Sequence, residues 1–157
     1  MTAVHLARRV VGSLRPGGPS PEDDAWAQGV LGPGERALWA RMSRPDRRHA
    51  VGVARRMGDA ARPVLAAALL HDVGKVESGL GTFARVGATI AGVAGGRDRW
   101  SGRLGDYLRH DEIGARLLTD AGSDALTVAW AREHHLPPAR WTVPPGVGAA
   151  LKAADDD

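Results

Sequence analysis

The chain has 157 residues, enough for one domain with a buried core, and a formal net charge of +3 at pH 7. It contains no cysteine, which excludes disulfides and thiolate-bound zinc, so any metal ion must be held by histidine, aspartate or glutamate. The longest apolar stretches, 63–70 and 86–96, are too short to span a bilayer, and no signal-peptide core follows Arg8 and Arg9, so we expect a cytoplasmic protein without a membrane segment.

The N-terminal half of the chain is typical of short helices separated by breaks that contain proline or glycine. Ser20 and Pro21 fit an N-cap and a first helical residue, and either Ser43 or Asp46 can cap the helix that carries His49. The helix over 62–73 is apolar on almost every side, so it is expected at the centre of the fold. A break is predicted at 32–34. In chain order, the predicted helices cover 4–14, 21–30, 35–42, the region 49–57, and 62–73.

The C-terminal half predicts further helices and no strands, because no segment alternates apolar and polar residues. Either Ser123 or Asp124 can cap the helix that leads to the histidine pair. The predicted elements are an apolar helix over 82–94, a polar loop over 95–105, and helices over 111–118, 125–135 and 145–155. The expected fold is all-α, a compact single-domain helical bundle, with an N-terminal helix and loose linker over 1–20 and a metal-binding helical domain over 21–157.

Histidine and aspartate supply the most informative pattern in the chain. An imidazole beside a carboxylate at the end of a buried helix, as in His71-Asp72, makes a poor core and a good metal site. Each signal also has an ordinary explanation, such as a histidine that caps a helix C-terminus or a solvated acidic tail. Helices can nevertheless bring such residues to one cleft. Five of the six histidines fall near helix ends or inner faces: His49, His71, His110, His134 and His135.

The order of these residues resembles the HD-domain superfamily of metal-dependent phosphohydrolases over residues 36–157. The histidine pair and His110 are most similar to the subgroup that binds two metal ions, as in HD-GYP-type phosphodiesterases. The acid and the Gly-Tyr-Pro motif that follow in those families are absent here, so cyclic di-GMP is not supported as the substrate. The matching runs are RRHAVGVAR (47–55), LLHDVGK (69–75), RHDEIGA (109–115), AREHH (131–135) and LKAAD (151–155).

The resemblance assigns a role to each matching residue. Asp72 is expected to bridge two ions and, with Lys75, to take part in catalysis, Lys75 facing the phosphate. Asp155 is preferred to Asp156 as the last ligand because it follows Ala-Ala. The implied ligand sets are His49, His71 and Asp155 for one ion and His110, His134 and His135 for the other.

Imidazole and carboxylate ligands suit one or two divalent ions of Mn, Fe, Ni, Co or Zn. Such ions lower the pKa of bound water to about 7, so a metal-bound hydroxide can attack phosphorus. Lys75, Arg48 and Arg109 are predicted to bind the phosphate of the substrate. The expected function is hydrolysis of a phosphomonoester or phosphodiester bond in a nucleotide-like small molecule.

Two alternatives stay open: a non-catalytic HD-fold module that binds a ligand or has a regulatory role, and a di-iron HD oxygenase. Relatives without activity usually lack several ligands, whereas this chain lacks none, which favours an enzyme. The sequence leaves the substrate, the native metal, the number of ions and the oligomeric state open.

Charged side chains outside the histidine pattern allow three smaller predictions. Eight arginines between Arg36 and Arg62 form either a solvated basic face or a patch for a phosphorylated ligand, and they do not alternate with aromatic residues as a dedicated nucleic-acid surface would. Glu133 and Asp111 are expected to hydrogen-bond histidine rings. Arg55 is expected on an outer face, so that Arg55→Ala is nearly silent.

Overall fold

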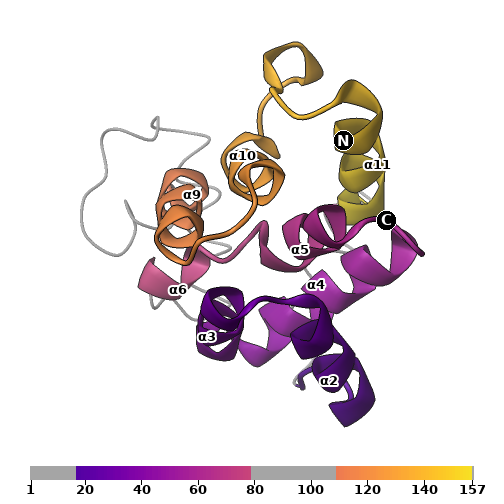
Figure 1. Cartoon of the computed structure of the whole chain (residues 1–157), viewed down its shortest axis with the longest axis vertical. Helices are drawn as coiled ribbons and strands as arrows, with labels where there is room; N and C mark the ends of the chain where they lie inside the picture. Colours follow the sequence, from indigo (N-terminus) through magenta and orange to yellow (C-terminus); the bar gives the residue numbers. More distant parts are fainter. Residues whose placement is uncertain (1–16, 79–108, 157) are drawn as a thin grey trace.

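The computed structural model describes residues 17–78 and 109–156, and over these ranges it consists of helices and connecting turns, without a strand (Figure 1). The prediction of an all-α fold is therefore confirmed. The predicted helices 4–14 and 82–94 and the loop 95–105 lie outside the described residues. The helices are α2 (Pro21–Val30), α3 (Pro33–Arg41), α4 (Arg44–Arg56), α5 (Arg62–Leu70), α6 (Lys75–Ser78), α9 (His110–Asp120), α10 (Ala125–Glu133), the 3-10 helix η2 (Pro138–Arg140) and α11 (Pro145–Asp156).

Polar side chains fix where several helices begin. The hydroxyl of Ser43 accepts a hydrogen bond from the amide of Asp46 at 3.3 Å, and the carboxylate of Asp124 accepts one from Leu126 at 2.9 Å, so Ser43 and Asp124 are the N-caps of α4 and α10. Pro33, expected in a break, instead lies in the first turn of α3, because a proline there loses no helical hydrogen bond.

Helix α5 forms the centre of the fold, as predicted. It packs against α4 on one side and α10 on another, and also touches α2 and α11 (Figure 1). Residues 66–70 are completely buried because alanine and leucine cover every face of the helix. The helix ends at Leu70 rather than at 73, so residues 71–74 form a turn at the centre of the molecule.

Among the described residues, no helix combines the length and apolar character that a membrane crossing requires.

Arg55 is exposed, as expected, but it joins two helices, so we revise the expectation of a silent replacement. Its guanidinium lies 3.8 Å from the centre of the Trp26 ring and 2.9 Å from a carboxylate oxygen of Asp23, both on α2. We expect Arg55→Ala to lower the free energy of unfolding by about 0.5–1 kcal/mol through the lost stacking on Trp26. Urea unfolding measures this, with Arg116→Ala, an exposed arginine of α9, as the control. Identical midpoints for Arg55→Ala and the parent would contradict the prediction.

Candidate metal centre

Seven side chains from five separate segments meet beside the end of α5. Their ligand atoms form two groups, and within each group all of these atoms lie within 4.8 Å of one another. The segments are far apart in sequence, so the fold rather than local structure brings them together. The first group is His49 of α4, His71 of the turn and Asp155 of α11; the second is Asp72 of the turn, His110 of α9, and His134 and His135 after α10.

Asp72 lies between the two groups with one carboxylate oxygen toward each. Its Oδ2 lies 3.5 Å from Nε2 of His71, in the first group. Its Oδ1 lies 3.4 Å from Nε2 of His110 and 3.8 Å from Nε2 of His134, in the second group. A carboxylate placed in this way is suited to bridge two cations.

His71 and His134 are oriented by the same local arrangement. Each follows the last residue of a helix, and its Nδ1 donates to a backbone carbonyl three residues earlier, Ala68 at 2.9 Å and Ala131 at 3.0 Å. These hydrogen bonds satisfy carbonyls that a helix end leaves unpaired. They also fix the neutral tautomer in which Nε2 carries the lone pair.

The Nε2 atoms of His71 and His134 are buried and accept no hydrogen bond within the described part of the chain. A buried polar atom without a partner costs about 1–3 kcal/mol, so two of them in one cluster require an explanation. A divalent cation in each group, bound to the lone pair of His71 in one and of His134 in the other, supplies it, and the donor set of imidazoles and carboxylates fits a transition metal.

Charge and burial favour the metal-binding protonation states of Asp72 and His134, whereas at His71 burial is outweighed by the carboxylates of Asp72 and Asp155, which raise the pKa. Burial would raise the pKa of Asp72, but the ammonium of Lys75 and the ring of His71 outweigh it and hold that pKa well below its usual value. Burial lowers the pKa of His134, with smaller effects from Asp72 and His71. Asp72 is therefore a carboxylate and His134 a neutral imidazole at neutral pH, as metal ligands must be.

Asp155, not Asp156, faces the other members of the first group. Its Oδ1 lies 2.9 Å from Nε2 of His49 and 3.5 Å from Nε2 of His71, and only 4% of its side chain is exposed. Asp156 is 41% exposed and pairs with Lys152 at 2.7 Å.

This difference predicts opposite outcomes for neighbouring residues. We expect Asp155→Asn to reduce stabilisation by added Mn or Ni, because it removes a ligand of the first group, whereas Asp156→Asn keeps it. A bound ion at 100 times its Kd stabilises the folded state by about 2.7 kcal/mol, which a thermal shift detects easily. Equal shifts in the two variants would contradict the assignment of Asp155.

The remaining predicted residues lie around this cluster. The Lys75 ammonium pairs with Oδ2 of Asp72, while Arg48 donates to the carbonyl of Gly17 at 2.7 Å. Arg109 precedes His110 as the N-cap residue of α9. Binding of phosphate by Lys75, Arg48 and Arg109 stays a prediction.

Glu133 does not hydrogen-bond a histidine ring, contrary to expectation. Its carboxylate accepts from the amide and hydroxyl of Thr142, both at 2.6 Å, and from the amide of Val143 at 3.4 Å. The chain folds back after the prolines at 137–138, and the amides of this returning segment require an acceptor. Glu133 therefore holds the segment before α11 against the end of α10.

Gly74 and Gly114 have a role that the sequence analysis did not assign. A Cβ at Gly74 would lie 1.8 Å from the carbonyl oxygen of His110, and one at Gly114 would lie 3.2 Å from the amide nitrogen of Gly74. The turn after α5 and the first turns of α9 thus touch backbone to backbone, which brings His110 to Asp72. A glycine inside the helix predicted from 111 was the available signal, because glycine is costly there without a packing reason.

The family model of the HD domain matches residues 47–156, which is most of the chain and includes all seven converging side chains. Neither the search of curated proteins nor that of solved structures gave a match.

Proposed function

The chain belongs to the HD domain family, and from this we infer that it is a metal-dependent phosphohydrolase acting on a small phosphorylated molecule. The observation that carries the proposal is the position of Asp72 between two groups of candidate ligands, each with a buried imidazole nitrogen that has no hydrogen-bond partner among residues 17–78 and 109–156. Two neighbouring divalent ions would activate water and offset charge on the phosphate oxygens.

The protein's own part in this reaction is to hold the metal ions and to orient the side chains that bind them. Asp72 offers one oxygen to each group and so fixes their separation, while the backbone bonds of His71 and His134 keep both rings aimed inward. No side-chain nucleophile is required, in keeping with a cluster of imidazoles and carboxylates.

Both lysines of the chain contact an aspartate of this centre. Lys75 pairs with Asp72, and Nζ of Lys152 lies 4.0 Å from Oδ2 of Asp155. The other basic residues of the chain are arginines. Because the ammonium of Lys75 lies against Asp72, we expect it to donate to a phosphate oxygen of a substrate bound beside Asp72.

Elemental analysis of the purified protein followed by a screen of phosphorylated metabolites with added Mn or Ni tests the proposal. We expect one or two equivalents of a transition metal and release of phosphate from at least one compound class. If the fully metal-loaded protein hydrolyses none of these compounds, the assignment as a phosphohydrolase is wrong and a non-catalytic binding module is favoured. Turnover that requires oxygen would instead identify a di-iron oxygenase.

A further inference from the structure

Asp155 lies in the last turn of α11, which is an unfavourable place for a carboxylate. The helix ends at Asp156, so its last four carbonyls have no amide partner within it. Asp155 and Asp156 both lie at the negative end of the helix dipole, and this turn contains no basic residue. The ion pair between Lys152 and Asp156 offsets part of the cost. A candidate metal ligand thus lies on a turn that benefits from a contact outside the helix.

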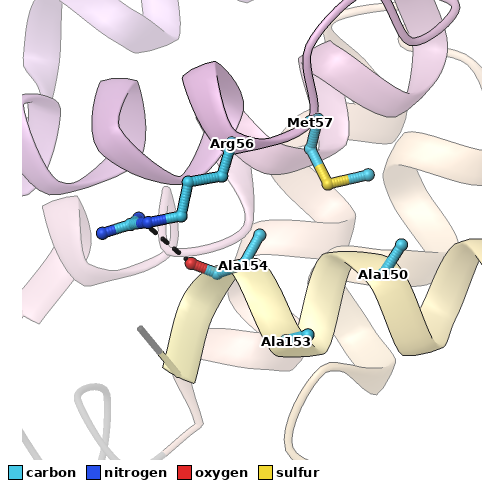
Figure 2. A pocket seen from close by; sticks show the side chains of 5 residues that line it. All are labelled: Arg56, Met57, Ala150, Ala153 and Ala154. Carbon is cyan, nitrogen blue, oxygen red and sulfur yellow. Dashed lines mark hydrogen bonds between the residues drawn. The ribbon is translucent and has the colours of Figure 1, made fainter.

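Arg56 of α4 makes such a contact. Its Nη1 donates to the carbonyl of Ala154 at 3.1 Å, immediately before Asp155 in the chain (Figure 2). The side chain runs back along α4, as long side chains on helices do, so that a Cβ on Gly52, one turn earlier, would lie 3.6 Å from Nη1. The guanidinium thereby pairs a carbonyl of the last turn and places a positive charge at the negative end of α11.

The same face of α4 carries a partner of Asp155. His49, Gly52 and Arg56 are spaced by three and four residues, which places them on one side of the helix. Nε2 of His49 lies 2.9 Å from Oδ1 of Asp155. One helix therefore contacts two consecutive residues of α11, the backbone of Ala154 through Arg56 and the carboxylate of Asp155 through His49. Movement of the first contact would change the second.

Apolar packing between α4 and α11 is incomplete beside this contact. A cavity of about 280 Å³ lies there, bounded at the end of α4 by Arg56 and Met57 and on α11 by Ala150, Ala153 and Ala154 (Figure 2). Alanine side chains are too short to fill the space, so dispersion contacts across it are lost. The hydrogen bond of Arg56 therefore contributes more to the attachment of the last turn than it would in a closely packed interface.

We propose that Arg56 is a positioning residue of the metal centre: it fixes the last turn of α11 on α4 and so keeps Asp155 beside the other members of the first ligand group. Arg56 acts through the backbone of Ala154, so its effect should fall on the first group and spare the second. The proposal rests on the metal centre of the proposed function and does not depend on hydrolysis.

Hydrogen exchange of the metal-free protein tests whether Arg56 holds the turn. We expect Arg56→Ala to speed exchange of the amides of residues 153–156 by about 5-fold or more, because a helix end that loses a charged donor opens more often. Arg55→Ala is the same change one residue earlier, and because Arg55 contacts α2 instead, these amides should not respond to it. Equal exchange in the two variants would overturn the proposal.

Calorimetric titration with Mn or Ni tests whether the held turn positions a ligand. His135→Ala removes a member of the second group and His49→Ala a member of the first, so each background measures mainly the other group. In the His135→Ala background we expect Arg56→Ala to raise the dissociation constant about 10-fold or more, as loss of a residue that orients a metal ligand does. In the His49→Ala background it should leave the dissociation constant unchanged.

Faster exchange with unchanged affinity in the His135→Ala background would overturn the positioning role and reduce Arg56 to a stabilising contact. An equal loss of affinity in both backgrounds would do the same, because it would show a general effect on the fold. Neither measurement includes a substrate, so the result is separate from the test of the phosphohydrolase assignment.

Discussion

Replacement of Asp72 with asparagine should abolish metal binding and lower phosphate ester hydrolysis by at least about 100-fold. Asparagine has nearly the same volume but carries no charge, and its amide nitrogen cannot ligate a cation. Because one Asp72 oxygen faces each ligand group, a single substitution weakens both. Metal content by elemental analysis and initial rates measure the effect, and circular dichroism should show an unchanged helical fold.

Asp124→Asn is the matched control for the same chemical change. Asp124 caps α10 away from the cluster, and asparagine is an equally good N-cap, so this variant should keep its metal and its activity. His71→Ala should resemble Asp72→Asn, since it removes a buried ligand nitrogen. An Asp72→Asn protein that retained metal and full turnover would refute the catalytic role of Asp72.

The convergence of the seven side chains of the metal centre could be anticipated because their order along the chain resembles that of the HD-domain superfamily. The structure places His49, His71 and Asp155 together and puts Asp72 with His110, His134 and His135, the grouping that the family resemblance implied. Their ligation itself stays a prediction. The all-α fold and the central position of α5 could also be predicted, because its apolar residues cover every face.

Local patterns were less reliable at helix ends. The apolar residues predicted a helix as far as residue 73, but α5 ends at Leu70, and the His71 ring donates to the carbonyl of Ala68 in place of a backbone amide. The chain then turns, with the amide of Val73 donating to Leu70 at 3.0 Å. Side-chain competition for backbone carbonyls depends on where the ring points, which periodicity does not report.

Two contacts between distant segments left no local signal. Glu133 adjoins two histidines in sequence, yet its carboxylate holds Thr142, and only the path of the returning chain determines this. The Trp141 ring likewise packs on the buried Gly148, where a Cβ would lie 2.6 Å from it. Such features depend on how helices pack and not on the residues of either helix alone.

Among the glycines that the structure describes, Gly74 is the one at which we expect an added methyl group to be most damaging. The new Cβ would lie 1.8 Å from the carbonyl oxygen of His110 and close to the amide of Gly114, so α9 must move away from the turn. Both partners are backbone atoms and cannot turn aside as a side chain would. We expect a loss of about 3 kcal/mol or more in the free energy of unfolding, at the upper end for overpacked sites.

Gly29→Ala provides the control with the opposite sign. Gly29 lies within α2, and an added Cβ meets no atom within 4 Å, so alanine should stabilise the protein by up to about 1 kcal/mol. Urea unfolding separates the two variants, and metal titration of Gly74→Ala at low temperature shows whether the folded fraction still binds. Displacement of His110 from Asp72 should weaken the second ligand group even where the fold survives. A Gly74→Ala protein with parental stability and metal affinity would show that the backbone contact does not position the site.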